Sequence, residues 1–458
     1  MFRGKVQTIH FVGIGGIGMS GIAEVLLSTG FTITGSDLSE GASVRRLRSL
    51  GARVHVGHDA AHVGTADVVV RSAAVGPSNP EIGEALRRGI PVIARAEMLA
   101  ELMRLKYGVA IAGSHGKTTT TSMVATAMQA GGLDPTAVIG GRLDSLGGTN
   151  ARRGVGEYLV AEADESDGSF LSLTPTIALI TNIDAEHLDH FGSLARLEDA
   201  FAEFGNRIPF YGFVAACFDA PRVLALVPRF RKRVVGYGFS RQADYRATDV
   251  VHDGLVSRFL AWRGEEKLGV VSLGVPGRHN VQNAVGAMCI ALELGVAFDV
   301  VCEAFAGFRG VQRRFTVVGE SEGVMWVDDY AHHPVEICAT LEAAEVSLPG
   351  RRIIAVFQPH RFTRVRDLWD DFRSALHRAS IVVVCPIYAA GEAPIDGIDH
   401  ERLAAGMRES GHRGVIVAGS VANATMEVAS MVRPGDVVIA MGAGDVGRLV
   451  RDLGGRVS

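Results

Sequence analysis

The stretch AIAGSHGKTTT, residues 110–120, lies between an apolar run at Tyr107–Ala112 and a helical pattern at Thr118–Gly131. Glycines allow a backbone to curl so that several N–H groups face a phosphate, and a helix N-terminus adds a positive dipole. In such a loop Lys117 is expected to reach the β- and γ-phosphates of a nucleotide, and the Thr118 hydroxyl to bind magnesium. A strand before the loop and a helix after it therefore predict a nucleotide site in an α/β domain.

The loop departs from the common GxxxxGK[ST] pattern, because Ile111 stands where the first glycine belongs. The simplest alternative is a glycine-rich turn with a surface lysine. Lysine is rare in this chain, however, since five lysines stand among 46 basic residues. A lysine in this position is thus less expected by chance, and we interpret residues 113–118 as a phosphate loop.

Length and composition limit the classes of protein to consider. At 458 residues the chain is too long for one hydrophobic core and suits two or three domains. A formal net charge of -4 gives no reason to expect a nucleic-acid partner. The five cysteines are scattered and form no CxxC pair, which favours a reducing compartment over a disulfide framework or a zinc site. The apolar stretch at 11–30 contains Glu24 and several glycines, so we expect no membrane span and no targeting sequence, and predict a cytoplasmic protein.

Short apolar runs alternate with helical patterns along the chain, which indicates parallel sheets covered by helices. The predicted fold class is α/β with three domains, each built on a largely parallel sheet with flanking helices. We predict a Rossmann-like domain at 1–106, a central P-loop domain at 107–312 and a second Rossmann-like domain at 313–458. The predicted strands are 8–13, 32–36, 67–74, 91–94, 107–112, 157–162, 176–182, 324–328, 352–357, 381–385, 415–418 and 436–441, with a strand-rich stretch at 234–272. The predicted helices include 16–28, 80–88, 97–104, 118–131, 194–206 and 280–294.

A second glycine motif, GIGGIG at 13–18, follows the first predicted strand, and Asp37 stands at the end of the next one. This spacing matches dinucleotide-binding sites, in which the acidic residue contacts a ribose hydroxyl. A nucleotide sugar carries the same diphosphate–ribose element, and the sequence shows no separate machinery for hydride transfer. We therefore favour a diphosphate held at a helix N-terminus, and a nicotinamide-dependent oxidoreductase is the alternative from a different class.

Two further motifs place candidate metal ligands near the ends of predicted strands, where the ligands of parallel sheets gather. Glu162 lies in LVAEADESD, residues 159–167, and His187 lies in TNIDAEHLDH, residues 181–190. Acidic clusters are more often solvated loops than metal sites. The position at strand ends makes Glu162 and His187 candidates for a magnesium site beside the phosphate loop.

In their order along nearly the whole chain, these motifs resemble the Mur ligase family, and within it the alanine-adding members. The segments at 13–18 and 35–37 resemble the family's UDP-sugar site, and GSHGKT at 113–118 resembles its variant of the phosphate loop. The segment RHNVQN at 278–283 resembles the stretch whose two asparagines hold the adenine. The resemblance implies UDP-sugar contacts at Gly13, Gly15, Gly16, Gly18, Ser36 and Asp37. It implies ATP contacts at Gly113, Ser114, His115, Gly116, Lys117, Thr118, Thr119, Asn280, Asn283 and Asp329.

The resemblance is most specific in two segments of the third domain, VDDYAHHP at 327–334 and QPHRFTR at 358–364. By resemblance, Asp329 contacts the nucleotide from this domain. An arginine fork suits the carboxylate of an amino acid whose amine must stay free to attack. Without the family, the two arginines of the second segment would be interpreted as surface charges. The implied amino-acid-binding residues are Tyr330, His332, His360, Arg361 and Arg364.

The resemblance also assigns roles at the reaction centre. It implies metal ligands at Thr118, Glu162 and His187, and catalytic roles for Lys117, His187 and Glu162. Several sister enzymes use a carbamylated lysine downstream of the histidine. No lysine occurs between Lys117 and Lys232, which agrees with the alanine-adding members.

The implied reaction uses ATP and Mg²⁺, with Mn²⁺ able to substitute. ATP phosphorylates the lactyl carboxylate of UDP-N-acetylmuramate, and L-alanine attacks the acyl phosphate, as a step of peptidoglycan precursor synthesis. The expected partners are these small molecules, with no nucleic acid and no membrane, and the protein is expected to be a monomer or homodimer. The alternatives are a ligase that attaches a peptide to UDP-N-acetylmuramate during wall recycling, and a non-catalytic nucleotide-binding regulator.

Overall fold

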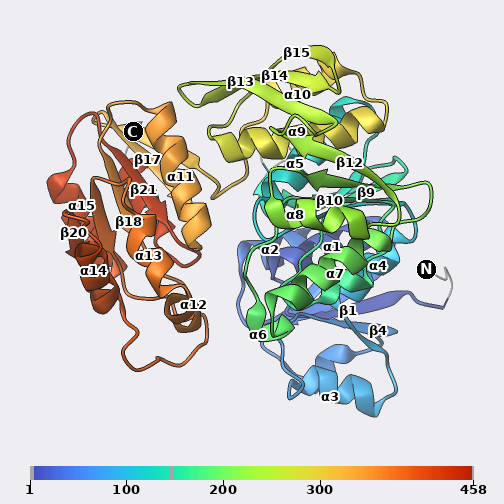
Figure 1. Cartoon of the computed structure of the whole chain (residues 1–458). Helices are drawn as coiled ribbons and strands as arrows, with labels where there is room; N and C mark the ends of the chain where they lie inside the picture. The colour runs from blue at the N-terminus through green and yellow to red at the C-terminus, as the bar shows by residue number, and fades with distance from the viewer. Residues whose placement is uncertain (1–4, 144–148, 456–458) are drawn as a thin grey trace. The chain divides into compact units, whose positions relative to one another are not determined.

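The computed structural model describes residues 5–143 and 149–455. Their strands form three sheets, with helices between many of the strands (Figure 1). This arrangement confirms the α/β class with largely parallel sheets. The chain packs into two compact units, of which the first comprises Met1–Thr248, Leu260–Val271 and Gln282–Phe308, and the second comprises Asp249–Phe259, Ser272–Val281 and Arg309–Ser458. The domain boundaries near residues 106 and 312 stay predictions.

The first sheet contains five strands, each parallel to its neighbours. They are β1 (Thr8–Val12), β2 (Thr32–Asp37), β3 (Arg53–Val56), β4 (Val68–Arg71) and β5 (Val92–Ala94), and the helices are α1 (Ile17–Ser28), α2 (Ala42–Ser49), α3 (Pro80–Arg87) and α4 (Arg95–Met103). In the spatial order β3-β2-β1-β4-β5, β1 is central. The glycine motif after β1 and Asp37 at the end of β2 therefore lie at the same edge of the sheet.

The second sheet contains ten strands. They are β6 (Tyr107–Ala112), β7 (Thr136–Leu143), β8 (Thr149–Arg152), β9 (Tyr158–Glu162), β10 (Ile177–Ile180), β11 (Phe213–Cys217), β12 (Arg233–Gly238), β13 (Tyr245–Asp253), β14 (Val256–Arg263) and β15 (Glu266–Leu273). The helices are α5 (Lys117–Ala130), α6 (Leu188–Phe191), α7 (Leu194–Asn206), α8 (Pro221–Leu226), α9 (Arg278–Glu293) and α10 (Phe298–Ala306). Strand β6 lies between β9 and β10 and is parallel to both. The loops that follow these three strands consequently meet at one edge.

The third sheet has six strands in the order β16-β17-β21-β18-β19-β20. They are β16 (Thr316–Ser321), β17 (Val324–Asp329), β18 (Ile353–Phe357), β19 (Ile381–Val384), β20 (Val415–Val417) and β21 (Val437–Met441). The helices are α11 (Pro334–Ser347), α12 (Phe362–Asp367), α13 (Trp369–Ala375), α14 (His400–Glu409), α15 (Val421–Met431) and α16 (Gly447–Gly454). Only the edge pair β16–β17 is antiparallel among the paired strands described here.

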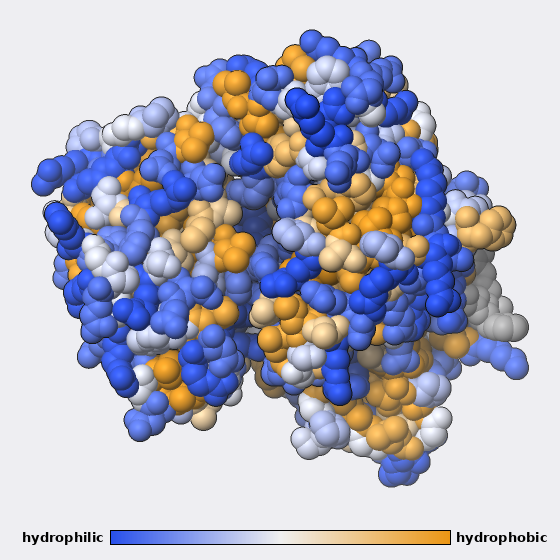
Figure 2. Space-filling view, in the orientation of Figure 1, coloured by the Kyte–Doolittle hydropathy of each residue, from blue (hydrophilic) through white to orange (hydrophobic). Residues whose placement is uncertain are grey.

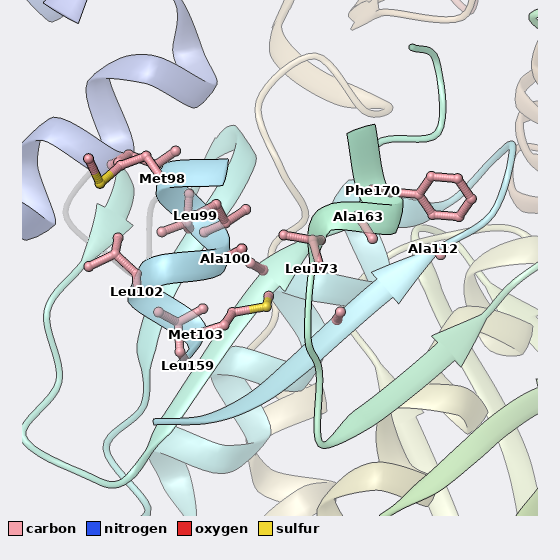
Figure 3. Packing of buried hydrophobic residues seen from close by; sticks show 14 of the residues in the cluster. Met98, Leu99, Ala100, Leu102, Met103, Ala112, Leu159, Ala163, Phe170 and Leu173 are labelled. Atoms are coloured by element: carbon pink, nitrogen blue, oxygen red, sulfur yellow. The ribbon is translucent and has the colours of Figure 1, made fainter. Parts of the chain in front are cut away.

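One hydrophobic core runs through the first two sheets and joins them. Helix α4 of the first sheet places Met98, Leu102 and Met103 in the same cluster as Leu159 of β9 (Figure 3). Each of these side chains is at least nine-tenths buried, which stabilises the folded state by about 1.5–3 kcal/mol per large apolar side chain. The first two sheets therefore belong to one compact unit.

Most predicted elements are confirmed, and two predicted segments, β6 and α7, have the predicted bounds. Others start or end differently: the strand expected at 67–74 covers only Val68–Arg71. Helix α2 was not predicted, because its sequence ASVRRLRS buries only Val44 and Leu47. Strands β3, β7, β8, β11 and β16 were also missed, since they are short or interrupted by glycine, arginine or threonine.

Within the described residues, no helix combines the length and the apolarity that a membrane crossing requires. On the face shown in Figure 2, hydrophilic residues separate the apolar patches from one another.

Candidate functional site

The phosphate loop runs from Gly113 to Thr118 and joins β6 to α5. Gly113 has φ +131°, and a Cβ atom there would lie 2.0 Å from Thr181 Oγ1. Gly116 has φ +82°, and a Cβ atom there would lie 2.8 Å from Asn283 Oδ1. Both positions therefore require glycine, for backbone conformation and for space. The loop lies tightly between the end of β10 and helix α9.

The segment after β10 holds this loop through a set of hydrogen bonds. Asn182 accepts from the His115 N–H at 2.8 Å and donates its amide to the His115 carbonyl at 3.0 Å. The Thr181 hydroxyl donates to the same carbonyl at 2.7 Å, and the Ser114 hydroxyl accepts from the Asp184 N–H at 2.8 Å. The loop is thus preorganised by neighbours that are distant in sequence.

The Lys117 side chain is fixed by its own loop and by Glu165. Its Nζ donates to the carbonyl oxygens of Gly113 and Ser114, at 2.6 and 3.2 Å, and to both Glu165 oxygens, at 3.0 and 2.8 Å. Burial lowers the pKa of Lys117, but the nearby carboxylates of Glu165 and Asp164 outweigh burial, so the pKa is raised above its usual value. The lysine is therefore an ammonium held beside the loop, where a nucleotide phosphate would need a positive charge.

Two groups of metal-type ligands lie beside the phosphate loop. The Thr118 hydroxyl donates to Glu162 Oε2 at 3.2 Å, so these two predicted ligands lie together. His187, at the start of α6 with φ +56°, lies instead with Glu165 and Glu186, and the ligand atoms of these three residues are within 4.8 Å of one another. Carboxylate and hydroxyl oxygens suit Mg²⁺, and imidazole is also accepted by Mn²⁺. The residues present therefore fit divalent ions at two neighbouring positions.

The sequence analysis did not single out Glu165 or Glu186. Both lie inside motifs that it quoted, between or beside acidic residues of equal local appearance. The sequence indicates only that the motif is acidic. Which of its carboxylates contacts Lys117 depends on the packing around that lysine.

Two other predicted ATP residues, Thr119 and Asn283, lie next to the same loop. Thr119 is buried in the first turn of α5. Asn283 of α9 lies against Gly116, as described above. One turn earlier, Asn280 is 7% exposed and donates its amide to the Pro276 carbonyl at 2.6 Å.

The glycine loop of the first sheet is held by the end of β2. The N–H groups of Gly13 and Ile14 donate to the Ser36 carbonyl at 2.9 and 3.0 Å. The Gly15 N–H donates to Asp37 Oδ2 at 2.8 Å. The Ser36 side chain is fully buried, so it supports the loop from below rather than facing a ligand. Oδ2 of Asp37 also supports the loop, because it accepts the Gly15 N–H.

Helix α1 begins directly after this loop, with Gly16 as its N-cap and Gly18 in its first turn. The first N–H groups of a helix have no acceptor within it, and they face an anion well. The Arg95 guanidinium approaches Gly18 so closely that a Cβ atom there would lie 2.8 Å from Nη1. Arg95 also donates to Asp164 at 3.2 Å, next to Glu165. This arginine, which the sequence analysis missed, connects the glycine loop with the carboxylates near Lys117.

In the second compact unit, Asp329 ends β17 and is 5% exposed. The N–H groups of Phe315 and Ala331 each donate to its carboxylate at 2.7 Å. Burial raises the pKa of Asp329 to about 6, although Arg314 acts in the opposite direction. Both oxygens are therefore oriented by backbone donors.

The residues of the second unit that are predicted to bind the amino-acid substrate lie together. The His332 ring contacts Tyr330 and His360 edge to face, with centroids 5.1 and 5.5 Å apart. Arg364 Nη1 donates to His360 Nδ1 at 3.0 Å, so this nitrogen is unprotonated. Burial and the neighbouring cations lower the pKa of His360 to about 3. On its other side the His360 ring stacks on Tyr388, which the sequence analysis missed.

Arg361 caps the N-terminus of α12 with φ +68°, a conformation that is rare for a residue other than glycine. Its N–H donates to the Tyr388 carbonyl at 2.9 Å, which helps to hold this backbone. Strained backbone of this kind is often kept where function requires it. The pair Arg361 and Arg364 thus lies on a fixed turn beside neutral His360.

Family models match the chain in three consecutive segments. The Mur ligase family catalytic domain matches residues 8–107, the Mur ligase middle domain matches 111–291, and the Mur ligase glutamate ligase domain matches 313–444. Curated relatives match over the full length. A UDP-N-acetylmuramate–L-alanine ligase from Sorangium cellulosum is 55% identical and covers 100% of this chain and 98% of its own length. One from Geobacter sp. strain M21 is 54% identical over 97% of this chain and 96% of its own length.

Solved structures give the same result. The UDP-N-acetylmuramate-alanine ligase from Thermotoga maritima superposes with a TM-score of 0.84 at 30% identity, over 98% of both chains. A murein peptide ligase from Psychrobacter arcticus has a TM-score of 0.73 at 23% identity, over 99% of this chain and all of its own, which shows the shared fold. With three family models in order and relatives more than half identical along its whole length, the chain belongs to the Mur ligase family.

Proposed function

We propose that this chain is an ATP-dependent ligase that joins L-alanine to the lactyl carboxylate of UDP-N-acetylmuramate. The products are UDP-N-acetylmuramoyl-L-alanine, ADP and phosphate. The observation that carries the proposal is the full-length identity of 55% to a curated ligase of this activity. The phosphate loop, whose lysine is held by Glu165, and the paired arginines of the second unit supply the chemistry that such a reaction requires.

In the first step, the γ-phosphoryl group of ATP passes to the lactyl carboxylate oxygen, and ADP leaves. Lys117, held by its own loop and by Glu165, would neutralise charge on the transferred group, and the loop N–H groups would orient the phosphates. Asn280 and Asn283 would hold the adenine, as the family resemblance implies. Magnesium would be held by Thr118 and Glu162, with a second ion near Glu165, Glu186 and His187, and would supply charge neutralisation.

In the second step, the neutral amine of L-alanine attacks the acyl carbon, a tetrahedral intermediate forms, and phosphate leaves while the nitrogen loses one proton and keeps the other as the amide N–H. Arg361 and Arg364 hold the alanine carboxylate and leave the amine free. Because its pKa is lowered to about 3, His360 stays neutral and adds an aromatic surface beside the two arginines, without a third positive charge. The segment QPHRFTR at 358–364 favours one small amino acid over a peptide, as the resemblance implies.

The UDP-sugar binds the first sheet, with its diphosphate at the start of α1 and a ribose hydroxyl near the outer oxygen of Asp37. We expect the protein to work in the cytoplasm as a monomer or homodimer. Sedimentation velocity at micromolar concentration tests the oligomeric state.

The experiment that tests the function is phosphate release from Mg-ATP with UDP-N-acetylmuramate and one amine at a time. Release with L-alanine, and much less with glycine, other amino acids or a tripeptide, is the expected result. Release with the tripeptide alone would instead identify a wall-recycling ligase. No release with any amine, together with binding of NAD, would overturn the ligase assignment in favour of an oxidoreductase.

A further inference from the structure

The mechanism gives no role to Glu81, which is a buried acidic residue. Glu81 stands in the first turn of α3, far in sequence from both glycine loops, and its side chain is completely buried. A carboxylate removed from water destabilises the fold by several kcal/mol unless hydrogen bonds replace its hydration. The groups that bond to Glu81 therefore indicate which part of the fold it supports.

Four groups donate to this carboxylate. The Ser36 hydroxyl lies 2.5 Å from Oε2, His10 Nε2 lies 3.3 Å from the same oxygen, and His62 Nδ1 lies 3.0 Å from Oε1. The Asp59 N–H donates to Oε1 at 3.2 Å. Burial acts to raise the pKa of Glu81, but these hydrogen bonds outweigh it and lower the pKa to about 2. Glu81 is consequently an ionised carboxylate at neutral pH.

This carboxylate fixes the orientation of Ser36. The Ser36 hydroxyl donates to Glu81 and is 3.0 Å from His58 Nδ1, whose N–H it can accept. Ser36 is 0% exposed, so no ligand reaches its hydroxyl in this arrangement. His10 of β1 is held in turn, since its Nδ1 lies 2.8 Å from Thr34 Oγ1 of β2. Strand β2 is thus bonded to Glu81 directly through Ser36, and indirectly through Thr34 and His10.

The end of β2 is also what holds the glycine loop. The Ser36 carbonyl accepts the N–H groups of Gly13 and Ile14, and Asp37 accepts that of Gly15. Hydrogen bonds therefore lead from Glu81 to Ser36 and from Ser36 to Gly13 and Ile14, and the next residue, Asp37, holds Gly15. A shift of Ser36 moves the acceptors on which the shape of the loop depends.

A metal site would be a different explanation for a carboxylate among histidines. Among residues 5–143 and 149–455, two groups of metal-type side chains converge closely enough for an ion, and Glu81 belongs to neither. The ring nitrogens instead lie at hydrogen-bond distance from the carboxylate or from serine, which satisfies the groups without an ion.

We propose that Glu81 is a positioning residue for UDP-sugar binding, which acts through Ser36 to hold the Gly13–Gly18 loop in its binding shape. The proposal rests on the proposed function in so far as this loop binds the UDP-sugar. The described contacts of Glu81 do not include the phosphate loop, so its role is expected to affect binding of the UDP-sugar and not of ATP.

The test compares Glu81→Gln with Glu84→Gln, a matched change on the same helix at a carboxylate that pairs with Arg87 at the surface. We expect Glu81→Gln to raise KM and Kd for UDP-N-acetylmuramate at least about tenfold, because small misplacements of binding groups have effects of this size. KM for ATP should change less than about twofold, since the phosphate loop is untouched. Glu84→Gln should leave all these constants unchanged. A purely structural role would instead lower the amount of active protein and leave both KM values as they are.

Equal UDP-sugar affinity in folded Glu81→Gln and the parent protein would overturn the proposal. Should Glu81→Gln fail to fold, Ser36→Ala tests the same chain of hydrogen bonds with a smaller change, and a selective rise in KM for the UDP-sugar is again expected. Calorimetric titration with UDP alone separates this proposal from the proposed function. A parent protein that binds UDP but releases no phosphate would refute the ligase activity and still allow the test of Glu81. A parent protein that binds neither UDP nor the UDP-sugar would refute the role of Glu81.

Discussion

The loop after β1 and the loop after β6 both join a buried parallel strand to a helix, and both are rich in glycine. Different groups hold them in shape. The loop after β6 contains Lys117, whose ammonium is bound by two loop carbonyls and by Glu165. The loop after β1 has no cation of its own, and the end of β2 holds its N–H groups through Ser36 and Asp37.

This difference corresponds to the chemistry expected at each loop. A phosphoryl group that is transferred gains and redistributes charge, and a preorganised cation stabilises that change. A diphosphate that is only bound needs a constant arrangement of donors. The same local fold therefore serves catalysis in one place and binding in the other, and variants of one loop should leave the other intact.

The largest expected effect is that of Lys117→Ala. Loss of the ammonium should lower kcat by about 1,000-fold, because it removes a charge aimed at the transferred group. Affinity for the UDP-sugar should stay unchanged. Phosphate release and calorimetry measure the two quantities, and Lys267→Ala at an exposed position is the control. Loss of UDP-sugar binding in Lys117→Ala would contradict the separation of the two loops.

A pair of glycine variants tests the same separation from both sides. In Gly113→Ala the new methyl group would collide with Thr181, and in Gly15→Ala it would lie 2.8 Å from Asp37 Oδ2. We expect Gly113→Ala to weaken ATP binding by about 100-fold with little effect on the UDP-sugar, and Gly15→Ala to do the reverse. Each variant is the control for the other. Equal losses of both affinities in either variant would show that the loops are coupled.

The residues predicted to bind the amino-acid substrate extend the comparison to a third site, where arginine side chains would bind the ligand. Arg364→Ala should raise KM for L-alanine roughly 10- to 100-fold, the value of a charged hydrogen bond, and leave KM for ATP unchanged. Arg366→Ala, two residues later on the same helix and paired with Asp367 at the surface, is the control. A similar effect of both substitutions would argue against a specific contact by Arg364.

The last prediction concerns the stability of the fold and its dependence on Glu81. The pKa of Glu81 is lowered from 4.5 to about 2, so its charged form stabilises the fold above pH 4.5, and this contribution is lost as pH falls toward 2. The linked free energy is about 3 kcal/mol. The difference in unfolding free energy between the parent and Glu81→Gln should therefore shrink between pH 5 and about pH 3. Urea unfolding at several pH values measures it, and a difference independent of pH would contradict the charged state.

Local sequence was sufficient wherever a function depends on adjacent residues. The phosphate loop, the glycine motif and the arginine turn are each contiguous, and the elements that flank them are confirmed by the structure. It was insufficient where several equivalent residues compete, as among Glu162, Asp164 and Glu165, because only packing decides which carboxylate reaches Lys117.

The sequence by itself determined the α/β class, the place of the two glycine loops and the family, because strand periods, glycine spacing and motif order are local properties that survive without coordinates. Only the tertiary structure decided which distant side chains support those loops. Arg95 beside Gly18, Glu81 beneath Ser36 and Tyr388 against His360 have no local signal. Parallel strands bring together segments that lie tens of residues apart in the chain. Where such segments are buried, a polar group without a hydrogen-bond partner destabilises the fold, so each of these contacts matters.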